Sequence, residues 1–134
     1  MPEVKDQQSV DQRADQPQFL TQTRFTEFDI PDPVQKGIAD AGFTYCSPIQ
    51  AQVLPISLSG KDIAGQAQTG TGKTAAFLIT LFTRLGTVPK RRNRLPVALI
   101  VSPTRELAYQ IYEEAQILGK HTGMRCVRVV GGVE

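Results

Sequence analysis

A glycine-rich loop between two apolar runs constrains this chain more than any other feature of its sequence. The loop reads Ala67-Gln68-Thr69-Gly70-Thr71-Gly72-Lys73-Thr74. Backbone amides in such a loop converge on an anion, and a following helix adds its free first-turn N–H groups and the positive end of its dipole. Glycine also allows positive φ angles and a close approach of the backbone to phosphate. The loop therefore predicts a phosphate-binding site between a strand and a helix.

The last two residues of the loop carry its chemistry. Lys73 supplies a positive charge for the outer phosphates, and the hydroxyl of Thr74 is a ligand for Mg²⁺. We therefore expect both residues to be catalytic and Thr74 to be the metal ligand. The general pattern has glycine at the position of Ala67, and a glycine turn that merely joins a strand to a helix is the alternative. The Gly-Lys-Thr triplet favours the phosphate site.

The rest of the chain predicts an α/β fold. Apolar runs predict strands at 61–67, 97–101 and 125–130. Cap and breaker residues predict helices from Asp32-Pro33 to Gly42, from Ser47-Pro48 to Ser59-Gly60 with a kink or early end at Pro55, from Lys73 onward, and from Thr104 to Lys120. Strands that alternate with helices are typical of a parallel sheet with right-handed crossovers.

Composition sets the broad class. The chain has 134 residues, 40% of them hydrophobic, and a net charge of +2, which suits one small domain or part of one. Residues 1–24 are polar and predict a flexible leader, with order beginning at Phe25. No apolar run approaches the about 20 residues of a membrane helix, so we expect a cytoplasmic protein with no membrane contact. Cys46 and Cys126 have no partner at a metal-ligand spacing and are expected to be reduced core thiols.

Upstream of the loop lies a second informative stretch, Gly42-Phe43-Thr44-Tyr45-Cys46-Ser47-Pro48-Ile49-Gln50. A glutamine offers the donor and acceptor needed to read the edge of adenine, and an aromatic ring can stack on a base. Beside the phosphate loop, the stretch resembles the adenine-recognition Q motif of the DEAD-box RNA helicases. The resemblance implies that Phe25, Phe43, Ser47 and Gln50 bind ATP together with the loop residues 67–74. The alternative is that Gln50 is an ordinary polar helix residue and Phe25 a core residue.

Two further segments match the same family. Pro103-Thr104-Arg105 follows the second predicted strand, and Gly131-Gly132 follows the third. In the family these segments contact the sugar-phosphate backbone of RNA, which implies sequence-independent binding of single-stranded or duplex RNA. Tyr109 and Tyr112 are candidates for base stacking or for partial core packing. The basic residues within 90–94 are candidates for an RNA patch or for a solvated loop.

The resemblance runs from Phe25 to Gly132 and is strongest to a bacterial member of the family. It implies the RecA-like fold of the P-loop NTPases, a parallel sheet with helices on both faces, with 25–134 as an incomplete first lobe. The chain contains no Asp-Glu-Ala-Asp, no Ser-Ala-Thr and no second lobe. We therefore expect the N-terminal part of an ATP- and Mg²⁺-dependent RNA helicase that by itself hydrolyses ATP very poorly.

Two other functions stay open at this point. One is a truncated, non-catalytic module that binds nucleotide or RNA, and the other is an unrelated P-loop ATPase. The candidate protein partners are an RNA-degradation complex and a ribosome-assembly complex.

Overall fold

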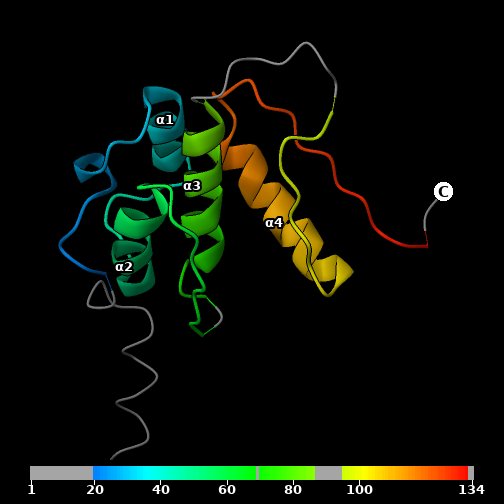
Figure 1. Cartoon of the computed structure of the whole chain (residues 1–134), viewed down its shortest axis with the longest axis horizontal. Coiled ribbons are helices and arrows are strands. Elements are labelled where there is room, and N and C mark those ends of the chain that lie inside the picture. The colour runs from blue at the N-terminus through cyan, green and yellow to red at the C-terminus, as the bar shows by residue number, and fades with distance from the viewer. Residues whose placement is uncertain (1–19, 69, 87–94, 133–134) are drawn as a thin grey trace, which may run out of the picture.

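The computed structural model describes residues 20–68, 70–86 and 95–132, whose regular structure is helical (Figure 1). Its elements are a 3-10 turn and four α-helices: η3 (Phe25–Glu27), α1 (Asp32–Asp40), α2 (Pro48–Ser57), α3 (Lys73–Gly86) and α4 (Arg105–Leu118). Most of the predicted leader and the basic residues within 90–94 lie outside the described residues, as does Thr69. No helix in the described ranges is long and apolar enough to cross a bilayer.

Backbone pairing occurs before Phe25, within the segment predicted to be a leader. The backbone N–H of Thr21 donates to the carbonyl of Cys46 at 2.8 Å, and the N–H of Cys46 donates to the carbonyl of Thr23 at 2.8 Å. An antiparallel β-bridge then joins Arg24 to Tyr45. Polar composition concealed this pairing because the hydrogen bonds use backbone groups.

Helices α2 and α4 begin at the predicted cap residues, and α1 begins one residue earlier than predicted. The hydroxyl of Ser47 accepts from the N–H of Gln50 at the start of α2, and Thr104 accepts from the N–H of Leu107 at the start of α4. These bonds satisfy first-turn donors that a helix leaves free. Helix α1 begins at Asp32, one residue before the expected start, with Pro31 as its cap.

The predicted ends hold for α1 and differ for α2. Gly42 has a φ of 78°, and the N–H of Phe43 donates to the carbonyl of Ile38 at 3.1 Å, which closes α1 as a glycine C-terminal motif does. Helix α2 passes through Pro55 and ends at Ser57, before the predicted stop at Ser59.

The core lies between the helices. Apolar side chains from η3, from all four helices and from the two segments that flank α1 form one buried cluster: Phe25, Ile30, Val34, Ile38, Cys46, Leu54, Ala75, Leu78, Ile79, Phe82, Ala115 and Leu118. Each large apolar side chain of this kind stabilises the fold by about 1.5–3 kcal/mol relative to its exposed state. Cys46 is fully buried and Cys126 half-buried against the cluster, and both are free thiols, as expected.

Two glycines let α4 approach its neighbours. A Cβ on Gly37 of α1 would lie closer than 3.0 Å to the backbone carbonyl of Leu118 at the end of α4. A Cβ on Gly119 would lie 2.5 Å from the ring of Phe82 on α3. The crossing of α1, α3 and α4 therefore depends on missing side chains at these two positions.

The predicted strands at 61–67, 97–101 and 125–130 are wrong for this structure, because the described residues form no β-strand. The three segments run as irregular chain, and the second and third expose Leu99 (85%) and Val129 (87%). A strand needs a neighbour for its N–H and C=O groups, and strands that follow one another in sequence are not always neighbours in a sheet. None of the three segments hydrogen-bonds to another through its described backbone.

Candidate functional site

The predicted phosphate loop leads directly into α3. Gly70 and Gly72 have φ angles of 80° and 83°, which L side chains rarely adopt. The hydroxyl of Thr71 donates to the carbonyl of Gln68 at 2.7 Å and tightens the turn. Helix α3 begins at Lys73, so its free first-turn N–H groups open onto the loop. This is the geometry of an anion site at a helix N-terminus.

Both of the residues expected to carry the chemistry lie at this helix start. The ammonium of Lys73 donates to the carbonyl of Ala67, so the lysine folds back over its own loop. Thr74 is half-buried, and its hydroxyl makes no hydrogen bond with the described residues. A cation charge and an unengaged hydroxyl oxygen at a helix N-terminus fit a phosphate group with its Mg²⁺.

Gln50 connects the adenine stretch to the phosphate loop. Its side chain is 5% exposed. The amide oxygen accepts from the N–H of Ser47 at 2.9 Å, and the amide nitrogen donates to the carbonyl of Gly72 at 3.1 Å. The hydroxyl of Ser47 donates to the carbonyl of Thr71 at 2.6 Å. Gln50 is thus buried and hydrogen-bonded to both segments, and its binding to adenine stays a prediction.

The two aromatic residues of the predicted adenine end pack against each other. The rings of Phe25 and Phe43 are stacked, with centroids 6.2 Å apart and planes 28° apart. Phe25 is 2% exposed and Phe43 36% exposed, so a ligand reaches Phe43 more easily. Phe25 is a core residue in this structure, and its stacking on adenine stays a prediction.

The predicted RNA contacts form a second group at the start of α4. The guanidinium of Arg105 lies against the double glycine, since a Cβ on Gly132 would be 2.7 Å from its nitrogen. Gly132 has a φ of 76°. Pro103, Thr104, Arg105, Gly131 and Gly132 are all exposed. The structure therefore brings together two segments that lie far apart in sequence, both with groups that suit phosphate.

Sequence reasoning missed Arg128 in this region. Its guanidinium lies over the rings of Tyr109 and Tyr112, neither of which belongs to the buried core. The signal was present in the alternation of Cys126, Arg128 and Val130, which share one side of an extended segment.

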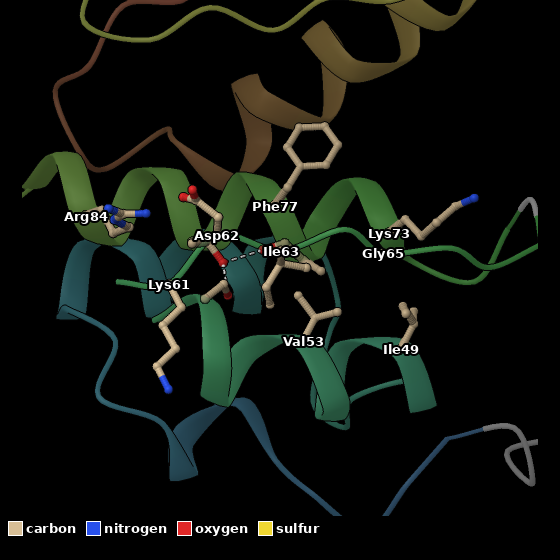
Figure 2. Close-up of a pocket in the computed structure, with 12 residues that line it drawn as sticks. Ile49, Val53, Lys61, Asp62, Ile63, Gly65, Lys73, Phe77 and Arg84 are labelled. Carbon is tan, nitrogen blue, oxygen red and sulfur yellow. Dashed lines mark hydrogen bonds between the residues drawn. The ribbon is translucent and has the colours of Figure 1, made fainter. Parts of the chain in front are cut away.

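A hollow of about 470 Å³ adjoins the phosphate loop (Figure 2). It lies between α2, residues 61–65 and α3, and its walls include the apolar side chains of Ile49, Val53, Ile63 and Phe77. Of the described residues in the loop 67–74, Lys73 alone lines it. The hollow has both apolar and charged walls, lies beside the phosphate cradle and does not coincide with it.

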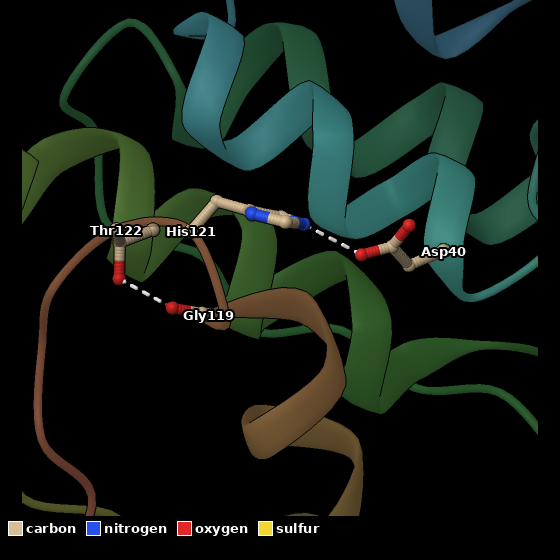
Figure 3. Close-up of polar contacts among 4 residues, drawn as sticks. All are labelled: Asp40, Gly119, His121 and Thr122. Carbon is tan, nitrogen blue, oxygen red and sulfur yellow. Dashed lines mark hydrogen bonds and ion pairs between the residues drawn. The ribbon is translucent and has the colours of Figure 1, made fainter.

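A polar contact on another face ties α1 to the end of α4 (Figure 3). His121 Nε2 and Asp40 Oδ2 are 2.6 Å apart, and both side chains are partly exposed. His121 is a surface residue shortly after the end of α4, with Asp40 as its partner. The described residues contain no group of three or more His, Cys, Asp or Glu side chains that could hold a metal ion.

Comparisons with known proteins agree with this arrangement. A sequence model described as DEAD/DEAH box helicase matches residues 47–134. Proteins named ATP-dependent RNA helicase RhlB are 50% identical over 115 residues in Pseudomonas aeruginosa and 49% identical over 113 residues in Pseudoalteromonas atlantica. Each alignment covers 84% of this chain, but 29% and 27% of the relative. Both relatives are bacterial, which agrees with the expected resemblance to a bacterial member of the family.

Solved structures show the same likeness. The RNA helicase Prp28 from Chaetomium thermophilum, solved bound to ADP, has a TM-score of 0.76 and 36% identity over 86% of this chain and 28% of its own. A DEAD box protein from Methanococcus jannaschii has a TM-score of 0.72 and 33% identity, over 83% of this chain and 30% of its own. These neighbours confirm the expected fold class, part of a RecA-like helicase lobe. They also rule out an unrelated P-loop ATPase.

Proposed function

The chain belongs to the DEAD/DEAH box helicase family, and from this premise we propose that it is the ATP- and RNA-binding first part of an ATP-dependent RNA helicase. The observation that carries the proposal is the hydrogen bond between Gln50 and Gly72. It joins the stretch that would read the base to the loop that would hold the phosphates. One nucleotide can therefore contact both.

The phosphate end of this site would work by positioning. Loop amides and the start of α3 would bind the phosphate oxygens, and the ammonium of Lys73 would leave the carbonyl of Ala67 for the outer phosphates. Thr74 would hold Mg²⁺, which supplies charge neutralisation along the phosphates. At the other end, Gln50 would offer its amide to adenine, with Phe43 and Phe25 beside the base.

The proposed RNA-binding residues would contact the sugar-phosphate backbone of RNA and not its bases. Arg105 offers a charged fork to a phosphate, the exposed N-terminus of α4 offers amides, and Gly131-Gly132 let the nucleic-acid backbone approach closely. Such contacts carry no sequence information, so we expect sequence-independent binding of RNA.

Turnover requires more than this chain holds. The Asp-Glu-Ala-Asp and Ser-Ala-Thr motifs and the second lobe of the family do not occur in the 134 residues. A phosphoryl-transfer site without a metal-side carboxylate or an arginine finger loses most of its electrostatic stabilisation. We propose that the chain alone binds ATP and RNA but hydrolyses ATP poorly, and that RNA remodelling belongs to a two-lobed protein in the cytoplasm.

The test is base selectivity. Fluorescent derivatives of ATP and GTP would be titrated onto the wild-type chain, Gln50→Ala and Gln52→Ala. Gln52 is an exposed glutamine on the same helix and serves as the matched control. We expect Gln50→Ala to weaken ATP binding about tenfold more than GTP binding, because the lost amide reads adenine. Equal losses for both nucleotides would contradict the adenine site.

Lys73→Ala tests the phosphate end separately. It should remove most affinity for the ATP derivative and leave adenosine binding unchanged, since adenosine has no phosphates. Efficient RNA-stimulated hydrolysis by the wild-type chain would contradict the proposal that it lacks the parts for turnover.

A further inference from the structure

Arg128 lies on a platform of two tyrosines that belong to one face of α4. Its guanidinium carbon is 4.0 Å from the centre of the Tyr109 ring and 5.1 Å from that of Tyr112. Residues three apart on a helix are neighbours on its surface. A guanidinium this close to ring faces is held by cation–π attraction, and its N–H edges stay available for other partners.

The segment that carries Arg128 runs alongside α4. Val127 and Val129 are 79% and 87% exposed, whereas Cys126 packs against the core and Arg128 lies on the α4 tyrosines. Further along, Gly132 lies at Arg105, at the start of the same helix. The chain from Arg128 to Gly132 therefore runs antiparallel to α4, from its tyrosines to its N-terminus.

The charges of Arg105 and Arg128 are a second property that the two side chains share. Neither Arg105 nor Arg128 forms an ion pair with a carboxylate among the described residues. Both arginines are exposed. Two uncompensated guanidinium groups on one side of a helix attract an anion that carries several charges in a row.

We propose that Arg128 is a second phosphate contact for a single-stranded nucleic acid, adjoining the one at Arg105 and the double glycine. The inference rests on the proposed RNA binding of this chain and adds a site to it. Four to seven residues of α-helix separate Arg105 from the two tyrosines, a rise of about 6–10 Å, which suits nearby phosphates of one extended strand. The tyrosines orient Arg128, and the arginine covers the ring faces that bases would need.

The experiment measures binding of a fluorescein-labelled oligouridylate of about ten nucleotides to the whole chain by anisotropy, over a series of KCl concentrations. Arg128→Ala should weaken binding about three- to tenfold and reduce the slope of log K against log salt by about 0.7, the value for one phosphate contact on a single strand. Arg128→Lys should keep the slope, because it keeps the charge. Arg125→Ala is the matched control, an exposed arginine of the same segment from which we expect little change.

The variants also separate this inference from the function on which it rests. If the wild-type chain does not bind the RNA, the proposed function fails. If Arg105→Ala weakens binding and Arg128→Ala does not, the second contact alone is wrong. A loss in Arg128→Ala with an unchanged salt slope would also overturn it, because the arginine would then act only on structure. Tyr109→Phe keeps the ring and should bind as the wild type does, with circular dichroism confirming that each variant is helical.

Discussion

The side-chain amide of Gln50 donates to the backbone carbonyl of Gly72 at 3.1 Å. The donor lies on the first turn of α2, and the acceptor lies in the phosphate loop one residue before α3. A base that takes this amide proton competes with the loop for it. If Gln50 reads the base, as proposed, base recognition and loop conformation would be coupled, and such coupling would act equally in both directions.

The first prediction concerns the two glycines of this loop. Gly70→Ala and Gly72→Ala both place a side chain at a positive φ, a strain of about 1–2 kcal/mol. A Cβ on Gly72 would also come closer than 3.0 Å to the Gln50 amide nitrogen, whereas a Cβ on Gly70 meets nothing within 4 Å. We expect Gly72→Ala to lower the melting temperature more than Gly70→Ala, measured by circular dichroism without nucleotide. Equal shifts would mean that the Gln50 contact adds nothing to stability.

The second prediction concerns the crossing of α1 and α4. Gly37→Ala should destabilise the chain by about 1–3 kcal/mol, because the added methyl group overlaps the carbonyl of Leu118 and such overpacking is costly. Gly86→Ala is the control, since among the described residues its Cβ would meet only Met124, at 4.0 Å, and alanine favours a helix. Urea unfolding followed by helical circular dichroism measures both. A Gly37→Ala chain as stable as the wild type would refute the close crossing.

The third prediction concerns alkaline pH. Burial, with a smaller effect from Glu27, raises the pKa of Cys46 from 9.0 to about 11. The folded pKa exceeds the unfolded one, so this contribution to stability is complete below pH 9.0 and is lost as pH rises towards about 11.

Urea midpoints at about pH 7 and about pH 10 provide the measurement. The wild type should lose more stability between these pH values than Cys46→Ala does. Burial also raises the pKa of Cys126, so Cys126→Ala is compared in the same way. An identical loss in the wild type and Cys46→Ala would show that this thiol does not titrate differently on folding.

The fourth prediction concerns the contact between His121 and Asp40. Asp40 ends α1, where the helix dipole disfavours a carboxylate, so its loss also removes an unfavourable interaction. We expect Asp40→Asn to change the free energy of unfolding by less than about 1 kcal/mol, as is usual for exposed pairs. His121→Ala should cost more, because it leaves the carboxylate uncompensated. Thermal melts at low salt compare the two, and the reverse order would contradict the argument.

Helix boundaries were the most predictable part of the fold. Ser47 and Thr104 each accept a first-turn N–H, and Gly42 ends α1 with a positive φ, because these events depend on one or two residues. Strands depend on distant partners, so the apolar run 97–101 predicted a strand that the described structure does not form. The pairing of Thr21 and Thr23 with Cys46 was missed for the same reason.

The candidate site was also predictable only in part, because local features can be predicted and distant contacts cannot. The resemblance to the DEAD-box motifs singled out Gln50 and Arg105 by residue type and spacing. The pattern could not show that Gln50 is buried against the loop or that Arg105 lies at Gly132. The alternation of Cys126, Arg128 and Val130 placed Arg128 on one side of its segment. It could not show that Arg128 would cover Tyr109 and Tyr112, since this contact needs a helix and a distant segment to lie side by side.

Segments 97–101 and 125–130 have no backbone hydrogen-bond partner among the described residues, and this has a consequence for hydrogen exchange. Amide protons of α3 are held by helical bonds around a buried core that includes Leu78 and Phe82, so they exchange with solvent only when the helix opens. Amides on the two extended segments make no described backbone hydrogen bond with another segment and should exchange at nearly the rate of an unfolded peptide. A deuterium-exchange map of this chain would therefore show slow helices next to fast segments that are rich in valine.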